Sequence, residues 1–417
     1  MKDLKDVVAC YIDTGLFNEL AVQASETFKH VYFYNPSQID AFPASQDVAI
    51  TEGFDNITVI TNFFDYLKYF DLCVFTDIYQ GDLQEHLRSL GMPVWGSGKS
   101  EWLERDRMRT TEWMLSVGLP TPERKEIIGI DGLRKLPKDW FIKIDNYRYD
   151  AETFKKMGNP QMDSFFDSLA LILGHRKSTY KFMAEKMIPD ASEFGVDIYS
   201  VNGDYPKYGL YGLEVKGSSY GGKMGLIEGL PQSLKKVNDA LADVFKQERM
   251  KGHFSTEVRV TKRREGFLID PCMRDANPPH QSQMEIIGNL PEIAWAGANG
   301  ELVEPKIKAR YCAQCTMTSE FAALGEVAFE IPDKVKRFIK VKNVAKSEGV
   351  YYYIPNKDSK IETVGAVVGL GNTLDEAIKN CKDNASEVKA FQLEIDLGAL
   401  DALSEEIAKS KSYGITF

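Results

Sequence analysis

The residues best suited to chemistry lie in one segment of the chain, residues 252–280, whose pattern predicts a β-hairpin. Apolar and polar residues alternate over residues 254–260, and a second, shorter apolar run covers residues 267–270. The charged stretch between them, residues 262–266, ends in glycine and predicts the turn. Two antiparallel strands that meet at this turn would place their side chains opposite one another.

Four charged residues of this segment stand where a hairpin that only covers a core would carry apolar or small polar residues. They are Glu257, Arg259, Asp270 and Arg274. If the strands pair about the turn, Glu257 and Asp270 fall near each other on one face. Two neighbouring carboxylates repel unless a cation lies between them, and a set of oxygen ligands favours Mg²⁺. The hairpin therefore predicts one edge of a magnesium site.

Two basic residues earlier in the chain also stand where the pattern predicts burial. Arg107 shares a stripe with Leu103 in a helix expected over residues 97–118, and an arginine on an inward face requires an anion. An arginine whose stem packs at the edge of the helix explains the same pattern. Lys143 interrupts the apolar run of a strand expected over residues 140–144, so it requires a negative partner, unless it protects the edge of a sheet.

Two further segments supply charged groups. Residues 183–198 predict a strand, a short turn and a second strand, with Glu185 and Glu193 on either side of the turn. Residues 214–225 are rich in glycine and serine and contain two lysines, the first of which is Lys216. Such a loop can wrap a polyphosphate with backbone N–H groups and positive charge. A plain flexible turn has the same composition.

The first 100 residues alternate short strands with helices, which indicates a parallel sheet covered by helices. The strands are expected at residues 7–11, 30–34, 57–60, 72–75 and 94–95. Strand-rich sequence returns after residue 301, and helices close the chain. Because 417 residues exceed one ordinary core, two or three domains are expected.

Composition excludes several classes of protein. The formal charge of −10 argues against non-specific binding to nucleic acid, which requires a dense basic surface. No apolar run approaches the roughly 18 to 20 residues that span a bilayer, and the N-terminus lacks a signal-peptide pattern, so we expect a cytoplasmic protein without a membrane partner. Cys312 and Cys315 form a single CxxC pair without further ligands at zinc spacing, so reduced thiols are expected.

The order of these features resembles the ATP-grasp superfamily, most closely its glycinamide ribonucleotide synthetase (phosphoribosylamine–glycine ligase) branch. The segments that carry the resemblance are DRMRTTEWMLSVGLPTP, FIKI, AEKMIP, EVKGSSYGGKMG, STEVRV with FLIDPCMR, and VGAVVGLGNTLDEAIKNC. Each is degenerate, but their common order over about residues 90–390 is fairly specific. The resemblance implies an ATP-grasp fold of α/β and α+β class. It would comprise an N-terminal parallel α/β domain (1–118), an ATP-grasp domain of two subdomains (119–300) and a small β-rich C-terminal domain (301–417).

The resemblance also implies a nucleotide site that binds ATP. The cations near the phosphates would be Arg107, in place of the family's usual lysine, Lys143 and Lys216. Glu185 and the backbone near Met187 would receive the adenine, and Glu193 would hold the ribose. In the same way, Glu257 and Asp270 would be the Mg²⁺ ligands.

By the same resemblance, Arg274 would face the reacting carboxylate, with Arg259 as a second candidate. Three departures from the family pattern stand out. The flap after the phosphate-binding lysine reads DNYRYDAETF, without glycine, so Arg148 would reach the phosphates where the family uses backbone N–H groups. Cys272 replaces an asparagine that is usually the third metal ligand, so water or substrate would take that position. The tail DANPPHQ lacks the family's glycine-acid sequence, so phosphoribosylamine and glycine are not transferred to this chain.

The activity we expect is that of an ATP-dependent carboxylate–amine ligase, which forms an amide through an acyl phosphate and releases ADP and phosphate. Its partners would be a small-molecule carboxylate and a small-molecule amine, and it would be a monomer or a homodimer. Two alternatives stay open. One is an ATP-dependent small-molecule kinase on the same fold, and the other is a nucleotide-binding protein without catalysis, which the glycine-free flap and Cys272 would explain.

Overall fold

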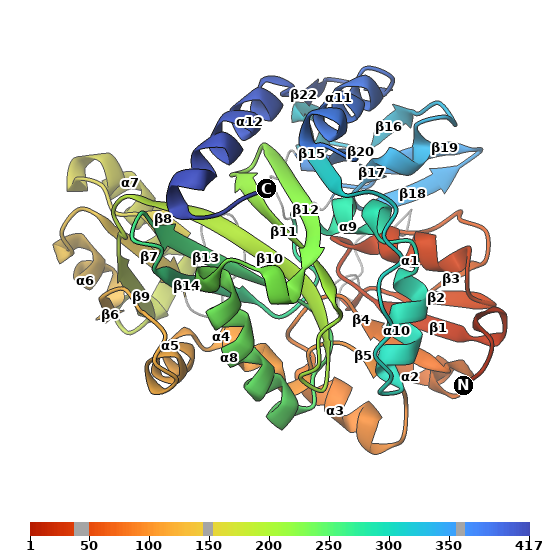
Figure 1. The fold of residues 1–417 in the computed structure, drawn as a ribbon, viewed down its shortest axis with the longest axis horizontal. Coiled ribbons are helices and arrows are strands. Elements are labelled where there is room, and N and C mark those ends of the chain that lie inside the picture. Colours follow the sequence, from red (N-terminus) through yellow and green to blue (C-terminus); the bar gives the residue numbers. More distant parts are fainter. Residues whose placement is uncertain (37–49, 145–152, 356–362) are drawn as a thin grey trace.

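The N-terminal part of the chain is a parallel sheet. The computed structural model describes residues 1–36, 50–144, 153–355 and 363–417. Five parallel strands lie in the order β3-β2-β1-β4-β5 (Figure 1). The strands are β1 (Val8–Ile12), β2 (His30–Tyr34), β3 (Ile57–Ile60), β4 (Leu72–Phe75) and β5 (Val94–Trp95), joined by α1 (Asn18–Ser25), α2 (Phe63–Tyr66) and α3 (Gly81–Ser89). The predicted parallel sheet is confirmed.

A small antiparallel sheet follows and projects from one side of the molecule (Figure 1). Its order is β6-β9-β7-β8. The elements are β6 (Arg124–Ile128), α6 (Gly129–Lys135), β7 (Trp140–Ile144), β8 (Thr153–Lys155), α7 (Asn159–Leu173) and β9 (Lys181–Lys186). Ile142 belongs to the core beneath α6 and α7. Because successive side chains of a strand point to opposite faces, Lys143 points away from that core.

A nine-stranded sheet forms the centre, in the order β14-β13-β10-β11-β12-β15-β20-β17, with β22 beside β15. Its strands are β10 (Ala191–Val201), β11 (Tyr208–Val215), β12 (Ser219–Leu226), β13 (Lys251–Thr261), β14 (Gly266–Cys272), β15 (Tyr311–Ser319), β17 (Ile339–Val341), β20 (Thr363–Gly371) and β22 (Leu393–Ile395). Strands from the middle and the end of the chain therefore share one sheet.

The remaining strands form a separate sheet in the order β18-β19-β16-β21. They are β16 (Val327–Glu330), β18 (Val344–Ser347), β19 (Val350–Tyr353) and β21 (Lys389–Ala390). The later helices are α8 (Gln232–Glu248), α9 (His280–Ile286), α10 (Leu290–Ala298), α11 (Leu374–Ala385) and α12 (Gly398–Ser410). Within the described residues, none of the helices combines the length and the apolar character needed to cross a bilayer.

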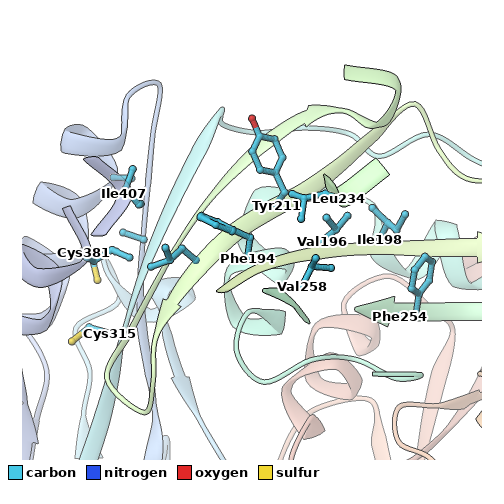
Figure 2. Packing of buried hydrophobic residues seen from close by; sticks show 14 of the residues in the cluster. Phe194, Val196, Ile198, Tyr211, Leu234, Phe254, Val258, Cys315, Cys381 and Ile407 are labelled. Carbon is cyan, nitrogen blue, oxygen red and sulfur yellow. The ribbon is translucent and has the colours of Figure 1, made fainter. Parts of the chain in front are cut away.

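The two faces of β10 and β13 differ in polarity. Phe194, Val196 and Val258 lie on one face, buried with Leu234 of α8 (Figure 2). The alternate residues lie on the opposite face and include Glu193, Glu257 and Arg259. Because α8 buries the apolar side, the polar side is the one available for a site.

Residues 97–118 do not form the single helix that their periodicity predicted. A 3-10 turn (Gly98–Glu101) leads into α4 (Trp102–Arg105), and α5 (Arg107–Ser116) begins anew after Asp106. The Asp106 carboxylate accepts a hydrogen bond from the Arg109 N–H at 3.0 Å, and this N-cap starts the second helix. The Asp106 cap therefore interrupts the helix although the apolar stripe continues, and Arg107 is the first residue of α5.

Residues 214–225 do not form a glycine-rich loop either. They belong to the β11–β12 hairpin, and the turn covers residues 216–218 alone. The glycines of β12 permit close packing instead of flexibility. A Cβ on Gly221 would lie 2.9 Å from a methyl carbon of Leu403, and one on Gly222 would lie 2.8 Å from a methyl carbon of Leu210.

The packing of α8 on the central sheet gives a first prediction. Phe245 is fully buried, and its ring centroid lies 4.6 Å from that of Phe254 on β13. Phe245→Ala is expected to lower the free energy of unfolding by about 3–5 kcal/mol, because it opens a cavity beneath the sheet. Leu171→Ala, on the exposed side of α7, should change it by less than about 0.5 kcal/mol. Urea denaturation measures both, and equal effects would contradict the role of α8.

Candidate functional site

The hairpin of β13 and β14 places two carboxylates face to face. Glu257 pairs with Asp270 across the ladder, as the alternation predicted. The next pair is Val258 with Leu268, so Ile269 is an extra, bulged residue on β14. The bulge lies directly beside the carboxylate pair.

Lys216, in the turn between β11 and β12, lies among three carboxylates. Its Nζ is 2.7 Å from Oε1 of Glu193, 3.1 Å from Oε2 of Glu214 and 3.1 Å from Oε1 of Glu257. Burial alone would lower the pKa of Lys216, but these carboxylates outweigh it and raise the pKa above its ordinary value. Lys216 is therefore a stable positive charge at the polar face of the sheet.

One lysine does not neutralise this group of acids. Burial, together with the charges of Glu193, Asp270 and Glu214, raises the pKa of Glu257 above its ordinary range, although Lys216 lowers it. An additional cation beside Glu257 would therefore stabilise its charged form. A carboxyl group with a raised pKa among charged neighbours is typical of functional sites.

Arg107 and Lys143 reach the same hairpin from two other parts of the chain. Nη1 of Arg107 donates to Oδ1 of Asp270 at 3.2 Å, and Nζ of Lys143 donates to the carbonyl of the bulged Ile269 at 2.5 Å. Both basic residues are buried. Each of the two buried basic residues therefore has an acceptor for its positive charge, as burial requires, and neither lies at a solvated edge.

Glu185 is fixed by an arginine that the sequence analysis did not single out. Arg124 lies opposite Glu185 in the ladder of β6 and β9, and its Nε and Nη2 lie 2.8 and 2.7 Å from Oε2 of that carboxylate. Lys143 Nζ lies 3.9 Å from the same oxygen. The N–H of Met187, after the strand, donates to the carbonyl of Asp139 at 3.0 Å. Only the strand pairing could have identified Arg124.

Arg274 lies where the tail of the hairpin meets the N-terminal sheet. Its Nε is 3.2 Å from Oε1 of the buried Glu104 and 3.4 Å from Oδ1 of Asp77. The N–H of Met273 also donates to Glu104, at 2.7 Å. Glu104 was likewise missed, because its helix gave no sign of what it faces.

Arg259 lies on the same face as Glu257, opposite Glu193 in the ladder, and donates to the carbonyl of Ala191 at 3.3 Å. Cys272 pairs with Ser255, and its sulfur lies 4.0 Å from the carbonyl oxygen of Arg274. Arg148 lies outside the described residues.

The donor set of the hairpin fits Mg²⁺. Protein sites for this ion often offer one or two carboxylates and leave the other positions to water and phosphate, which matches Glu257 and Asp270. The part of the chain that the structure describes contains no cluster of three or more histidine, cysteine or acidic side chains arranged to hold a metal. A metal here would therefore depend on substrate oxygens to complete its shell.

Known proteins resemble this chain in structure. No model of a protein family matches its sequence, and neither does any curated protein. Phosphoribosylamine–glycine ligase from Thermotoga maritima matches with a TM-score of 0.70 at 13% identity, over 93% of this chain and 99% of that one. The biotin carboxylase domain of 2-oxoglutarate carboxylase from Hydrogenobacter thermophilus matches with 0.70 at 10%, over 100% and 96%. L-amino acid ligase from Bacillus licheniformis matches with 0.59 at 15%, over 93% and 99%. The chain has the predicted ATP-grasp fold.

The crowding of acids around Lys216 predicts a pH-dependent stability. The pKa of Glu257 is higher in the folded chain than its ordinary value of 4.5, so this group stabilises the fold at low pH, and that contribution is lost as the pH rises. Lys216 stays charged throughout, because its pKa is raised. Glu257→Gln should match the parent chain near pH 4 and be more stable at pH 9. The side chain is 35% exposed, so screening limits the gain to about 1 kcal/mol.

Thermal unfolding at the two pH values measures this difference. Glu265→Gln is the matched control, because Glu265 lies in the exposed turn of the same hairpin. It should show no difference that depends on pH. A Glu257→Gln variant less stable than the parent at pH 9 would show that attraction to Lys216 outweighs the repulsion.

Proposed function

We propose that this chain is an ATP-dependent, Mg²⁺-dependent ligase that joins a carboxylate to an amine. The observation that carries the proposal is the convergence of Arg107, Lys143 and Lys216 on one hairpin that also holds two facing carboxylates. Phosphates bring the negative charge that such cations bind, and a divalent ion brings the positive charge that the carboxylates require. The fold supports the proposal, because similar structures include two ligases and a carboxylase domain in complex with MgADP.

The site can bind a nucleotide–metal pair by exchange of partners. Arg107 is paired with Asp270, and Lys216 with Glu257. Arg107, Lys143 and Lys216 would then pair with the phosphates, and Glu257 and Asp270 would hold Mg²⁺, so that no buried charge would be left alone. The ion would neutralise charge on the phosphates.

The other nucleotide contacts follow from the same placement. Glu185, fixed by Arg124, and the backbone near Met187 form the side proposed for adenine. Glu193, beside Lys216 on the polar face, is proposed to hold the ribose. Arg148 is proposed as a further phosphate ligand, in place of the backbone groups of a glycine-rich flap.

The chemical steps need positioning and charge more than a nucleophilic side chain. Arg274, with Arg259 as a second cation, is proposed to hold the substrate carboxylate, whose oxygen attacks the γ-phosphorus as ADP leaves. The nitrogen of the amine then attacks the acyl carbon, phosphate leaves, and the nitrogen loses a proton. Glu104 and Asp77 fix the Arg274 guanidinium, so little reorganisation is required at that group.

Removal of one proposed metal ligand tests this assignment. Asp270→Asn should reduce ATP turnover by about a thousandfold, because the proposed metal site loses one of its two charged ligands. The melting temperature should stay within a few degrees of the parent, because asparagine has the same shape and its oxygen can still accept the hydrogen bond from Arg107. Coupled detection of ADP measures turnover, with Glu265→Gln as the control. Unchanged turnover in Asp270→Asn would overturn the metal assignment.

The reaction itself is tested with the parent chain, ATP, Mg²⁺ and pools of carboxylates and amines. A ligase releases ADP and phosphate only when both substrates are present, and the product is an amide. A phosphorylated product that accumulates without an amine would instead identify a kinase. Tight binding of ATP without turnover under any combination would contradict an enzymatic role.

A further inference from the structure

A small, polar cavity lies beside the turn that carries Lys216. Its volume is about 130 Å³, well below the roughly 300–1,000 Å³ of a pocket for a drug-sized ligand. Its walls come from the β11–β12 hairpin, the segment after β14, α9 and the C-terminal strands. Most of its side chains are uncharged and polar, and they include Ser218, Asn277, Gln281, Gln314, Thr316 and Thr363. Such walls favour a small ligand that forms hydrogen bonds, because an apolar ligand would leave these groups without partners.

Three amides of this cavity form a hydrogen-bonded series. The Ser282 hydroxyl donates to Oε1 of Gln314 at 3.0 Å, and Nε2 of Gln314 donates to Oε1 of Gln281 at 2.8 Å. Nε2 of Gln281 then donates to Oδ1 of Asn277 at 2.9 Å. Gln281 and Gln314 are 1% and 4% exposed, so these bonds fix the direction of both amides. Because the series ends on the carbonyl oxygen of Asn277, the NH₂ group of that residue is the donor that it leaves for a ligand.

The charged groups of the lining stand on different sides of the cavity. Of the lining residues that the structure describes, Glu214 is the one acid and Lys342 the one base. Glu214 belongs to β11, and its Oε2 lies 3.1 Å from Nζ of Lys216. Lys342 follows β17, and its N–H donates to the carbonyl of Val364 on β20 at 2.9 Å. Because β12 and β15 separate β11 from β20 in the sheet, the acid lies near the proposed phosphate site and the base lies away from it.

We propose that this cavity binds the amine substrate, and that the substrate is a small amine with an oxygen acceptor in its tail, which the Asn277 amide binds. The inference rests on the proposed ligase function. The nitrogen of such an amine is directed to Glu214, beside Lys216, and its oxygen is directed to Asn277. A carboxylate at the Glu214 end of the cavity would be repelled, so the carboxylate substrate is not the molecule that fits here.

Asn277 also lies close in sequence to the group proposed for the other substrate. It follows Arg274 by three residues, so one segment after β14 supplies a contact for the carboxylate and a contact for the amine. An amine with a purely alkyl tail would leave the NH₂ group of Asn277 without a partner, and one with a bulky tail would exceed the cavity. Asn277 is therefore the residue that selects among amines.

Titration calorimetry of the full chain with MgADP present tests the inference with two amines of equal length, 2-methoxyethylamine and butylamine. The first should bind about fivefold more tightly, because its ether oxygen accepts a hydrogen bond and the methylene group of butylamine cannot. Asn277→Asp should bind the two equally, because aspartate can still accept the bond from Gln281 but has no NH₂ donor. Its charge attracts both ammonium groups alike, so the ratio of the two affinities is the measure. Asn372→Asp, the matched control at an exposed position before α11, should retain the preference.

The affinity for MgADP and the melting temperature show whether Asn277→Asp is folded. If it is not, Asn277→Ser replaces it and should also lose the preference, because the shorter serine side chain does not reach the ether oxygen. Equal binding of the two amines by the parent chain, or a preference that the folded variant keeps, would overturn the inference. A preference that depends on Asn277, without ADP formation from any carboxylate and amine, would uphold the amine site and reject the ligase. Amide formation from alkyl amines that is insensitive to Asn277→Asp would reject the inference alone.

Discussion

The repulsion between Glu257 and Asp270 is the constraint on which the rest of the site depends. Neighbouring strands hold the two carboxylates opposite one another, so cations must approach from elsewhere. Lys216 reaches Glu257 from a neighbouring hairpin, and Arg107 reaches Asp270 from the start of α5. Lys143 donates a hydrogen bond to the carbonyl of Ile269, the bulged residue of β14. Charge thus ties three separate parts of the chain to one hairpin, while α8 holds the hairpin's other face by apolar packing.

These ion pairs do not fully neutralise the negative charge of the carboxylates, and the remaining charge favours the binding of a further cation. The pKa of Glu257 stays raised although Lys216 lies 3.1 Å away, because burial and three other acids act against the lysine. A site compensated in full by its own lysines and arginines would gain little from a metal and would have to break strong pairs to bind phosphate. Partial compensation leaves the fold somewhat less stable at high pH but keeps the site ready for a ligand that brings charges of both signs.

Local patterns in the sequence predicted what depends on neighbours in sequence. Alternation placed Glu257 opposite Asp270, and the apolar run around Lys143 predicted its burial. Periodicity failed where Asp106 caps a new helix, because a cap acts on one turn and leaves the hydrophobic stripe intact. Composition likewise failed at residues 214–225, because glycine serves close packing as well as flexibility. The pairing of Arg124 with Glu185 depends on which strands become neighbours, and no local pattern records that.

Arg274 links the two halves of the proposed chemistry. The chain just before it carries Asp270 and Cys272 at the proposed metal edge of the hairpin, and the chain just after it carries Asp275, whose N–H donates to the carbonyl of Thr76 beside the N-terminal sheet. At the proposed metal site, a thiol in place of an amide would remove one contact but leave both carboxylates, and phosphate or water would fill that position. In the proposed function, a carboxylate held by Arg274 would lie next to the hairpin whose cations would bind the phosphates, which is the contact that an acyl phosphate requires.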